Sequence, residues 1–149
     1  MATIHLPSDF SEFLRLLSDH DVRYLLIGGH AVAFHGYVRS TADMDLWVPT
    51  DIENAGRLVE AMRKFGFDVP DLKPELFLKK EKLVRMGLPP MRIEIMTDIP
   101  GVSFEPAFAN REQTLVDGIG VDVIGLEELK ANKRATGRHK DLDDLENLP

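Results

Sequence analysis

The segment Gly28–Val48, GGHAVAFHGYVRSTADMDLWV, decides the fold of this chain. It follows an apolar stretch that we expect to be a strand, and it carries Asp43 and Asp45 in a second expected strand. Residues i and i+2 of a strand point to the same face, so the two carboxylates project together. Because like charges repel at this spacing, each carboxylate would raise the pKa of the other unless a cation or hydrogen-bond donors compensated, and Mg²⁺ prefers such hard oxygen ligands. The pattern therefore predicts a metal site on a strand.

The glycine pair Gly28–Gly29 predicts an anion site beside that metal site. Glycines at a turn before a helix let backbone amides approach an anion closely, and the start of the helix adds its positive end. Without the aspartates, the pair would indicate only a tight turn between a strand and a helix. Together, the two features predict that a phosphate group and a metal ion meet at one place.

The Gly28–Gly29 pair, the segment Arg39–Thr41 and the Asp43–Asp45 pair resemble the signature of the DNA polymerase β-like nucleotidyltransferase superfamily. More narrowly, the chain resembles small bacterial and archaeal nucleotidyltransferase-fold proteins related to toxins of the AbiEii/MenA type. The likeness continues through Arg92–Arg111 and into the tail Gly125–Leu148. Two glycines, a spacer, the aspartate pair and a later acidic strand in this order make a fairly specific signal.

The resemblance implies a third carboxylate on a neighbouring strand, and Glu94 is our candidate. In the segment MRIEIM, Ile93 and Ile95 share one face, so Arg92 and Glu94 share the other. Many relatives carry aspartate here, and the longer glutamate side chain would move a metal ion or a general base. Two alternatives stay open: Asp98 as the third carboxylate, and an ordinary surface ion pair between Arg92 and Glu94.

The resemblance also implies a mechanism. Asp43, Asp45 and Glu94 would hold two Mg²⁺ or Mn²⁺ ions for an in-line displacement at the α-phosphorus of a nucleoside triphosphate (NTP), with pyrophosphate leaving. Glu94 would also help to accept the proton of the acceptor. The expected contacts with the triphosphate and the leaving pyrophosphate are Gly28, Gly29, Ser40, Lys133 and Lys140. For the two lysines, a solvated helix face balanced by nearby acidic residues is an equally good interpretation.

Composition agrees with one compact domain over residues 1–149, ending in a helical segment at about 125–147. The 149 residues are 44% hydrophobic and suit a single core. The absence of cysteine excludes disulfides and thiolate chemistry, and the net charge of −7 argues against a nonspecific nucleic-acid binder. Because no segment resembles a signal peptide or a membrane span, we expect a cytoplasmic protein that does not contact membranes.

Periodicity and turn residues predict the elements. Ser8 would cap a helix that ends near His20, and a capping box formed by Thr50 and Glu53 would start a helix that ends at Gly66. Helices are also expected from Gly28 to Gly36, at 104–110 and in the tail. The expected strands are 23–27, the aspartate strand, 82–86, 91–97 and a hairpin over 113–124 that turns at Asp117–Gly118.

These elements predict an α+β fold: a small mixed β-sheet with the aspartate strand central and helices packed mainly on one face. The first hypothesis is a Mg²⁺-dependent enzyme that moves a nucleotide from an NTP to an RNA, tRNA or protein acceptor. It would be the toxin of a toxin–antitoxin pair, with an antitoxin or a second protomer as partner. The second is a noncatalytic module that binds a nucleotide or a protein. A third, transfer to a small molecule, has no supporting signature in the sequence.

Overall fold

The computed structural model describes residues 3–4, 8–41, 43–88 and 92–149. Within these ranges, seven strands form one mixed sheet in the order β1-β6-β7-β2-β3-β5-β4. The strands are β1 (Thr3–Ile4), β2 (Leu25–Ile27), β3 (Met44–Trp47), β4 (Leu83–Met86), β5 (Ile93–Met96), β6 (Glu112–Val116) and β7 (Ile119–Val123). The α+β class and the mixed sheet are as the sequence predicted, although β1, a two-residue strand, was not expected.

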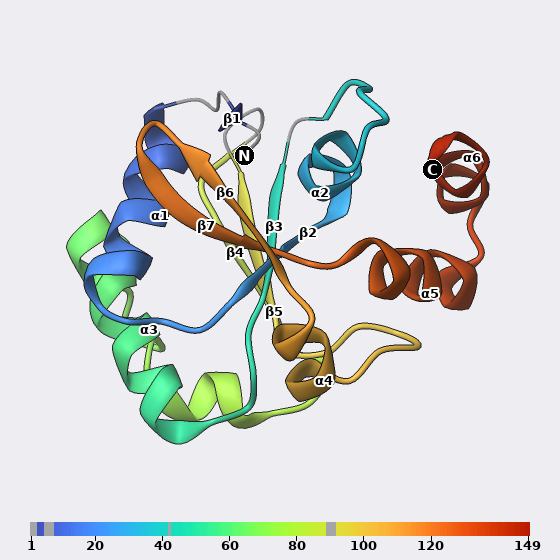
Figure 1. The fold of residues 1–149 in the computed structure, drawn as a ribbon. Coiled ribbons are helices and arrows are strands. Elements are labelled where there is room, and N and C mark those ends of the chain that lie inside the picture. The colour runs from blue at the N-terminus through green and yellow to red at the C-terminus, as the bar shows by residue number, and fades with distance from the viewer. Residues whose placement is uncertain (1–2, 5–7, 42, 89–91) are drawn as a thin grey trace.

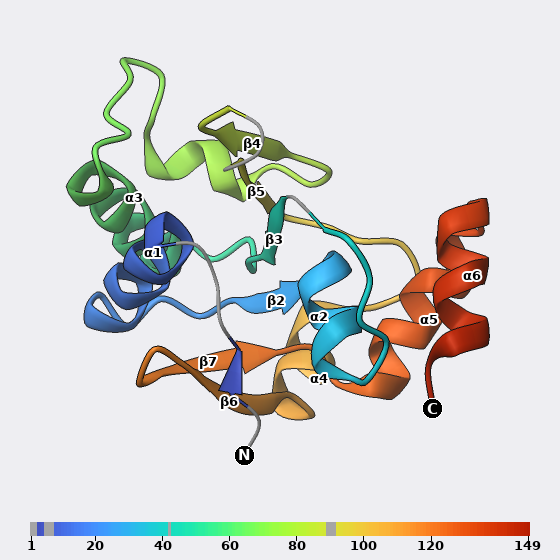
Figure 2. The same ribbon diagram turned by 90° about the horizontal axis from the view of Figure 1, so that it is seen from above.

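The two longest helices pack together over one side of this sheet, and the C-terminal pair lies on the opposite side of the molecule (Figure 1). The helices are α1 (Ser8–Asp19), α2 (Gly28–Phe34), α3 (Ile52–Phe65), the 3-10 helix η1 (Pro74–Leu78), α4 (Phe104–Ala109), α5 (Leu126–Thr136) and α6 (His139–Asn147). Seen from above, α1 and α3 again lie far from α5 and α6, with the sheet between them (Figure 2). Among the described residues, no helix has both the length and the apolar character needed to cross a bilayer.

Strand β3 lies inside the sheet, as predicted for the aspartate strand. It pairs antiparallel with β2 and parallel with β5, while β4 forms the edge beyond β5. Alternation along β3 buries Met44 and Leu46, and the apolar side chains of α1 at helical spacing, such as Phe13 and Leu17, are fully buried as well. The buried face of β3 therefore anchors the strand, which sets the direction of its acidic face.

Two turn predictions had different outcomes. In the β6–β7 hairpin, Asp117 and Gly118 have φ values of 48° and 80°, as a tight hairpin turn with two left-handed residues requires. The predicted capping box at Thr50 is wrong, because the side chain of Asp51 accepts the hydrogen bond from Asn54 N at 2.9 Å. Asp51 is itself a strong N-cap residue placed three positions before that amide.

The other predicted boundaries differ by one or two residues. Ser8 is the first residue of α1, and helix ends are uncertain by about that much in any assignment. The strand expected at 91–97 runs from Ile93 to Met96, and Met91, where it was expected to begin, lies outside the described residues.

A buried network of ion pairs holds the C-terminal helices in place. Lys133 of α5 lies 3.3 Å from Asp141 and 3.0 Å from Asp144, both on α6. Arg39, from the segment between α2 and β3, donates to Asp144 at 2.7 and 2.9 Å, and Arg138 donates to Asp141 at 2.8 Å. Burial raises the pKa of Asp144, but hydrogen bonds from Arg39 and Lys133 outweigh it and lower that pKa below its ordinary value. The network therefore ties α6 to the chain that leads into β3.

Removing one member of this network should strongly destabilise the protein. We expect Asp144→Ala to lower the free energy of unfolding by about 3 kcal/mol, because it leaves a buried lysine and an arginine with fewer partners. The control is Asp143→Ala, which removes an exposed carboxylate that accepts from Tyr37 at 2.9 Å and should cost less than about 1 kcal/mol. Urea denaturation measures both. Equal effects of the two substitutions would contradict the importance of the buried network.

Candidate active site

The carboxylate of Asp45 lies against the backbone at the start of α2. Ile27, the last residue of β2, pairs with Asp45 of β3, and the chain then turns through Gly28 into α2. Gly28 has a φ of +70°, and a Cβ atom added there would lie 2.3 Å from Asp45 Oδ2. Only glycine tolerates both the left-handed backbone and this approach. The two predicted features, the glycine turn and the aspartate strand, therefore meet at one point.

Glu94 faces this point from the neighbouring strand. In the parallel pairing of β3 and β5, Asp45 is the register partner of Glu94. The side chain of Glu94 is only 13% exposed and lies 3.5 Å from Arg85, which is its register partner on the edge strand β4. The structure thus brings Asp45 and Glu94 together, as the sequence predicted.

Asp43 has a different environment. It stands one residue before β3, and its carboxylate accepts from Arg92 Nη2 at 2.8 Å and from Arg92 Nε at 3.3 Å. The same Nε atom lies 3.3 Å from Glu94. The sequence suggested a pair between Arg92 and Glu94, and the structure adds Asp43 as the closer partner. Arg92 is therefore the shared cation of two predicted metal ligands.

The pKa values of the two aspartates shift in opposite directions. Burial, followed by the charges of Glu94 and Asp43, raises the pKa of Asp45 to about 6, although Lys140 and Lys133 act against this rise. The hydrogen bond from Arg92 lowers the pKa of Asp43 below its ordinary value. Asp45 is therefore a buried carboxylate with two like charges nearby, whereas the negative charge of Asp43 is balanced by Arg92.

A cleft of about 600 Å³ opens between this acidic face and helix α5. Its lining includes Gly28, Asp45, Glu94, Lys133, Thr136 and Arg138. The last two were not predicted. Arg138 was visible in the sequence only as one of several cations in the tail, and nothing in the pattern distinguished it from a solvated residue. The cleft joins segments that are far apart in the sequence.

The other residues predicted to contact the triphosphate or pyrophosphate are either packed or paired within the protein, or exposed. The space beside Gly29 is taken by Thr41, whose Oγ1 would lie 2.3 Å from an added Cβ atom, whereas Ser40 is exposed. Lys133 is only 5% exposed and is engaged by Asp141 and Asp144, so its ammonium group is already paired. Lys140 is exposed.

The donor chemistry of the acidic face suits a hard divalent cation, because it consists of carboxylate oxygens. In the described part of the chain, however, no three histidine, aspartate or glutamate side chains are gathered closely enough to hold one ion. The contacts of Arg92 with Asp43 and Glu94 show where a cation is already accommodated. The carboxylates of Asp43, Asp45 and Glu94 are therefore the right type of ligand for Mg²⁺ or Mn²⁺, although Arg92 contacts Asp43 and Glu94.

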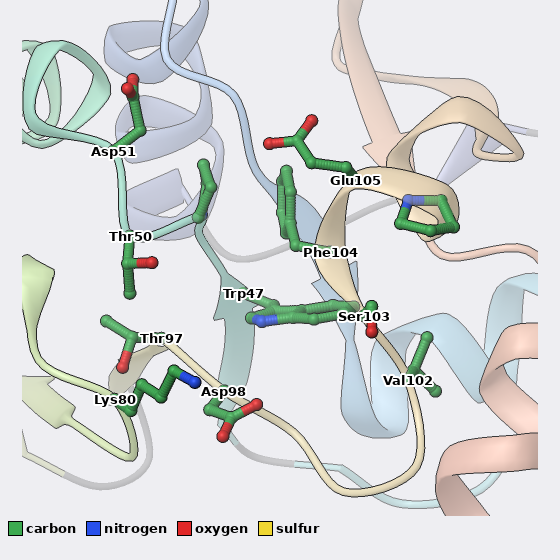
Figure 3. A pocket seen from close by; sticks show the side chains of 12 residues that line it. Trp47, Thr50, Asp51, Lys80, Thr97, Asp98, Val102, Ser103, Phe104 and Glu105 are labelled. Carbon is green, nitrogen blue, oxygen red and sulfur yellow. The ribbon is translucent and has the colours of Figure 1, made fainter.

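A second, smaller cavity of about 360 Å³ lies beyond the end of β3 (Figure 3). Trp47, Thr50, Lys80 and Asp98 contribute to its lining, and Asp98 also borders the larger cleft. Trp47 packs edge-to-face against Phe104 at 5.1 Å. Its buried Nε1 atom has no hydrogen-bond partner among the residues that the structure describes. This cavity adjoins the carboxylate cleft through Asp98, which lines both.

The arrangement of this mixed sheet and its helices has a counterpart among solved structures. A crystal structure of a protein from Thermotoga maritima, proposed to be a nucleotidyltransferase, shares this fold with a TM-score of 0.58. The likeness covers 92% of this chain and 88% of that chain at 19% sequence identity. No protein-family description and no curated protein matches the sequence. The comparison confirms the predicted fold.

The raised pKa of Asp45 generates a prediction for the metal-free protein. The pKa of about 6 exceeds the ordinary 3.8, so the ionised carboxylate destabilises the folded state above pH 6. We expect Asp45→Asn to raise the free energy of unfolding by about 1–2 kcal/mol near pH 8 and to have little effect below about pH 4, where both states are protonated. Denaturant titrations in a chelator measure this. The exposed Asp71→Asn serves as control, and a gain for Asp45→Asn that does not depend on pH would contradict the assignment.

Proposed function

We propose that this protein is a Mg²⁺- or Mn²⁺-dependent nucleotidyltransferase that moves a nucleotide from an NTP to an RNA, tRNA or protein acceptor. The observation that carries the proposal is the register of Asp45 and Glu94 on adjacent strands, with the backbone of Gly28 against Asp45. These groups line one cleft together with the cationic Arg138. Carboxylates on one wall and a cation on the other suit a metal-bound triphosphate.

Asp45 and Glu94 would hold the metal, joined by Asp43. When bound, the metal supplies Lewis-acid stabilisation of the charge that develops on the phosphoryl oxygens. The cleft that Gly28, Asp45 and Glu94 line would take the triphosphate, because its volume of about 600 Å³ opens beside these carboxylates. Arg138 and Lys140 would balance the charge of the pyrophosphate. Arg138 also donates to Asp141, but its side chain is 70% exposed, whereas the paired Lys133 is buried.

The proposed reaction breaks one bond and forms one. An acceptor oxygen bonds to the α-phosphorus, and the bond from that phosphorus to the bridging oxygen of pyrophosphate breaks. The acceptor loses a proton to Glu94, which passes it to solvent, and pyrophosphate leaves with the electron pair. Glu94 suits this role because it is the register partner of Asp45 and lines the same cleft.

A basic segment favours a polyanionic acceptor such as RNA or tRNA. Although the chain carries a net charge of −7, Lys79, Lys80 and Lys82 directly precede the edge strand β4, and Arg85 lies on that strand. Strand β4 pairs with β5, which carries Glu94. An anionic polymer that follows this edge would reach the acidic face. The resemblance to AbiEii/MenA toxins suggests further that the enzyme acts in the cytoplasm as the toxin of a pair, with an antitoxin or a second protomer as partner.

One observation favours the second candidate function, a noncatalytic module that binds a nucleotide or a protein. Arg92 already pairs with Asp43 and Glu94. If that pairing were permanent, the acidic face would have no place for a metal, and the cleft would bind its ligand without chemistry. Metal-dependent nucleotide binding separates the two functions.

The test of the donor site is a thermal shift with Mg²⁺ and each NTP, because binding stabilises the folded state whatever the acceptor is. We expect a shift that needs both metal and nucleotide in the wild type and is lost in Asp43→Asn/Asp45→Asn. Asp9→Asn/Asp19→Asn changes the charge equally at exposed positions of α1 and should keep the shift. A shift that survives loss of both site aspartates would sink the metal mechanism.

Transfer itself is measured with NTPs labelled at the α-phosphate, using total RNA and total protein as acceptors. Asp45→Asn should lower the rate at least about 100-fold, since charge-stabilising groups at such sites contribute on that order. The variant Asp9→Asn/Asp19→Asn again serves as control. Label that enters an acceptor equally well with Asp45→Asn would refute the assignment of Asp45.

A further inference from the structure

The guanidinium group of Arg92 lies between two of the three carboxylates of the acidic face. Its Nη2 atom is 2.8 Å from Asp43 Oδ2, and its Nε atom is 3.3 Å from Glu94 Oε1. The side chains of Arg92, Asp43 and Glu94 are 30%, 25% and 13% exposed, so these contacts are partly shielded from water. One cation thus holds two carboxylates that would otherwise repel each other.

Among the described residues, no three carboxylates are gathered closely enough to hold one ion, and two of those on the acidic face contact Arg92. Asp43 turns its Oδ2 atom to Arg92, although Asp45 and Glu94 are register partners on the adjacent strands. A carboxylate oxygen that accepts two N–H bonds from a guanidinium has fewer lone pairs left for a metal. In addition, a divalent cation would be repelled by a positive charge that close.

The position of Arg92 allows its side chain to move away from the carboxylates into solvent. It precedes β5 and is partly exposed, so its side chain has access to solvent without disturbing the core. A second arginine, Arg85 of the edge strand β4, lies 3.5 Å from Glu94, and the side chain of Arg85 is 57% exposed. The contact of Arg92 with Asp43, at 2.8 Å, is therefore the shorter of the arginine contacts on this face.

We propose that Arg92 is an internal counter-ion that occupies the cation position of the metal-free site and competes with the divalent metal for Asp43 and Glu94. The inference rests on the proposed function, because it assumes that these carboxylates bind a metal. Arg92 acts through the carboxylates and is a positioning residue. Arg92 stabilises the metal-free site. The apparent affinity for metal is then the intrinsic affinity multiplied by the fraction of molecules in which Arg92 no longer contacts the carboxylates.

The experiment measures binding of Mn²⁺ alone by calorimetry, without nucleotide. We expect Arg92→Gln to bind Mn²⁺ about tenfold more tightly than the wild type. This factor corresponds to a wild type in which molecules with Arg92 on the carboxylates outnumber those without this contact by about ten to one. Arg92→Lys, which keeps the charge, should stay close to the wild type. In thermal melts, Arg92→Gln should be less stable than the wild type in chelator and should gain more from added Mn²⁺.

Arg111→Gln is a matched control. Arg111 pairs with Asp122 at 3.1 Å, with side chains that are 31% and 21% exposed, outside the proposed metal site. This variant should bind Mn²⁺ like the wild type, and near-ultraviolet circular dichroism checks that each variant is folded.

The outcomes separate the inference from the proposed function. If the wild type binds Mn²⁺ but Arg92→Gln binds it equally or more weakly, Arg92 does not compete, and the inference alone fails. Arg92→Lys that binds as tightly as Arg92→Gln would also overturn it. If no variant binds Mn²⁺ and the wild type shows no shift with metal and NTP, the proposed function fails and the inference with it.

Discussion

The close approach of Asp45 to the backbone of Gly28 is the constraint on which the acidic face depends. It arises because β2 and β3 pair antiparallel with Ile27 opposite Asp45, so the chain must turn into α2 directly beside the carboxylate. A side chain at position 28 would collide with Asp45. Since β5 pairs on the other side of β3, Glu94 is placed opposite the same carboxylate. The positions of the turn, the aspartate and the glutamate therefore all follow from the pairing of three strands.

Charge is balanced separately on the two sides of the cleft. On the sheet side, Arg92 and Arg85 offset Asp43 and Glu94, while burial and then the charges of Glu94 and Asp43 raise the pKa of Asp45. On the helical side, Arg39 and Lys133 are paired with the buried Asp144. Both sets place charged groups at the cleft while most of their charge is neutralised within the protein. A ligand with both a metal and phosphates would interact with both sides at once.

The sequence predicted the elements well where local physics determines them. Alternation along MRIEIM placed Arg92 and Glu94 on one face, and Asp117–Gly118 marked the hairpin turn, because both depend only on backbone geometry. The prediction of an N-cap at Thr50 failed because Thr50 and Asp51 both suit that role. The helix begins at Ile52, which makes Asp51 the N-cap. For Lys133, the sequence left a phosphate contact and a solvated face equally open. The structure shows instead a buried residue paired with Asp144, since helix α6 folds back onto α5.

The sequence by itself determined the fold class, the glycine turn, and the acidic residues that share a strand face, because strand periodicity and the conformational range of glycine are local properties. Only the tertiary structure decided which of these groups meet. It placed Glu94 opposite Asp45 and Thr41 beside Gly29, and it brought Arg92 closer to Asp43 than to Glu94. Such contacts depend on strand register and on the docking of helices that are distant in sequence, and no local pattern encodes either.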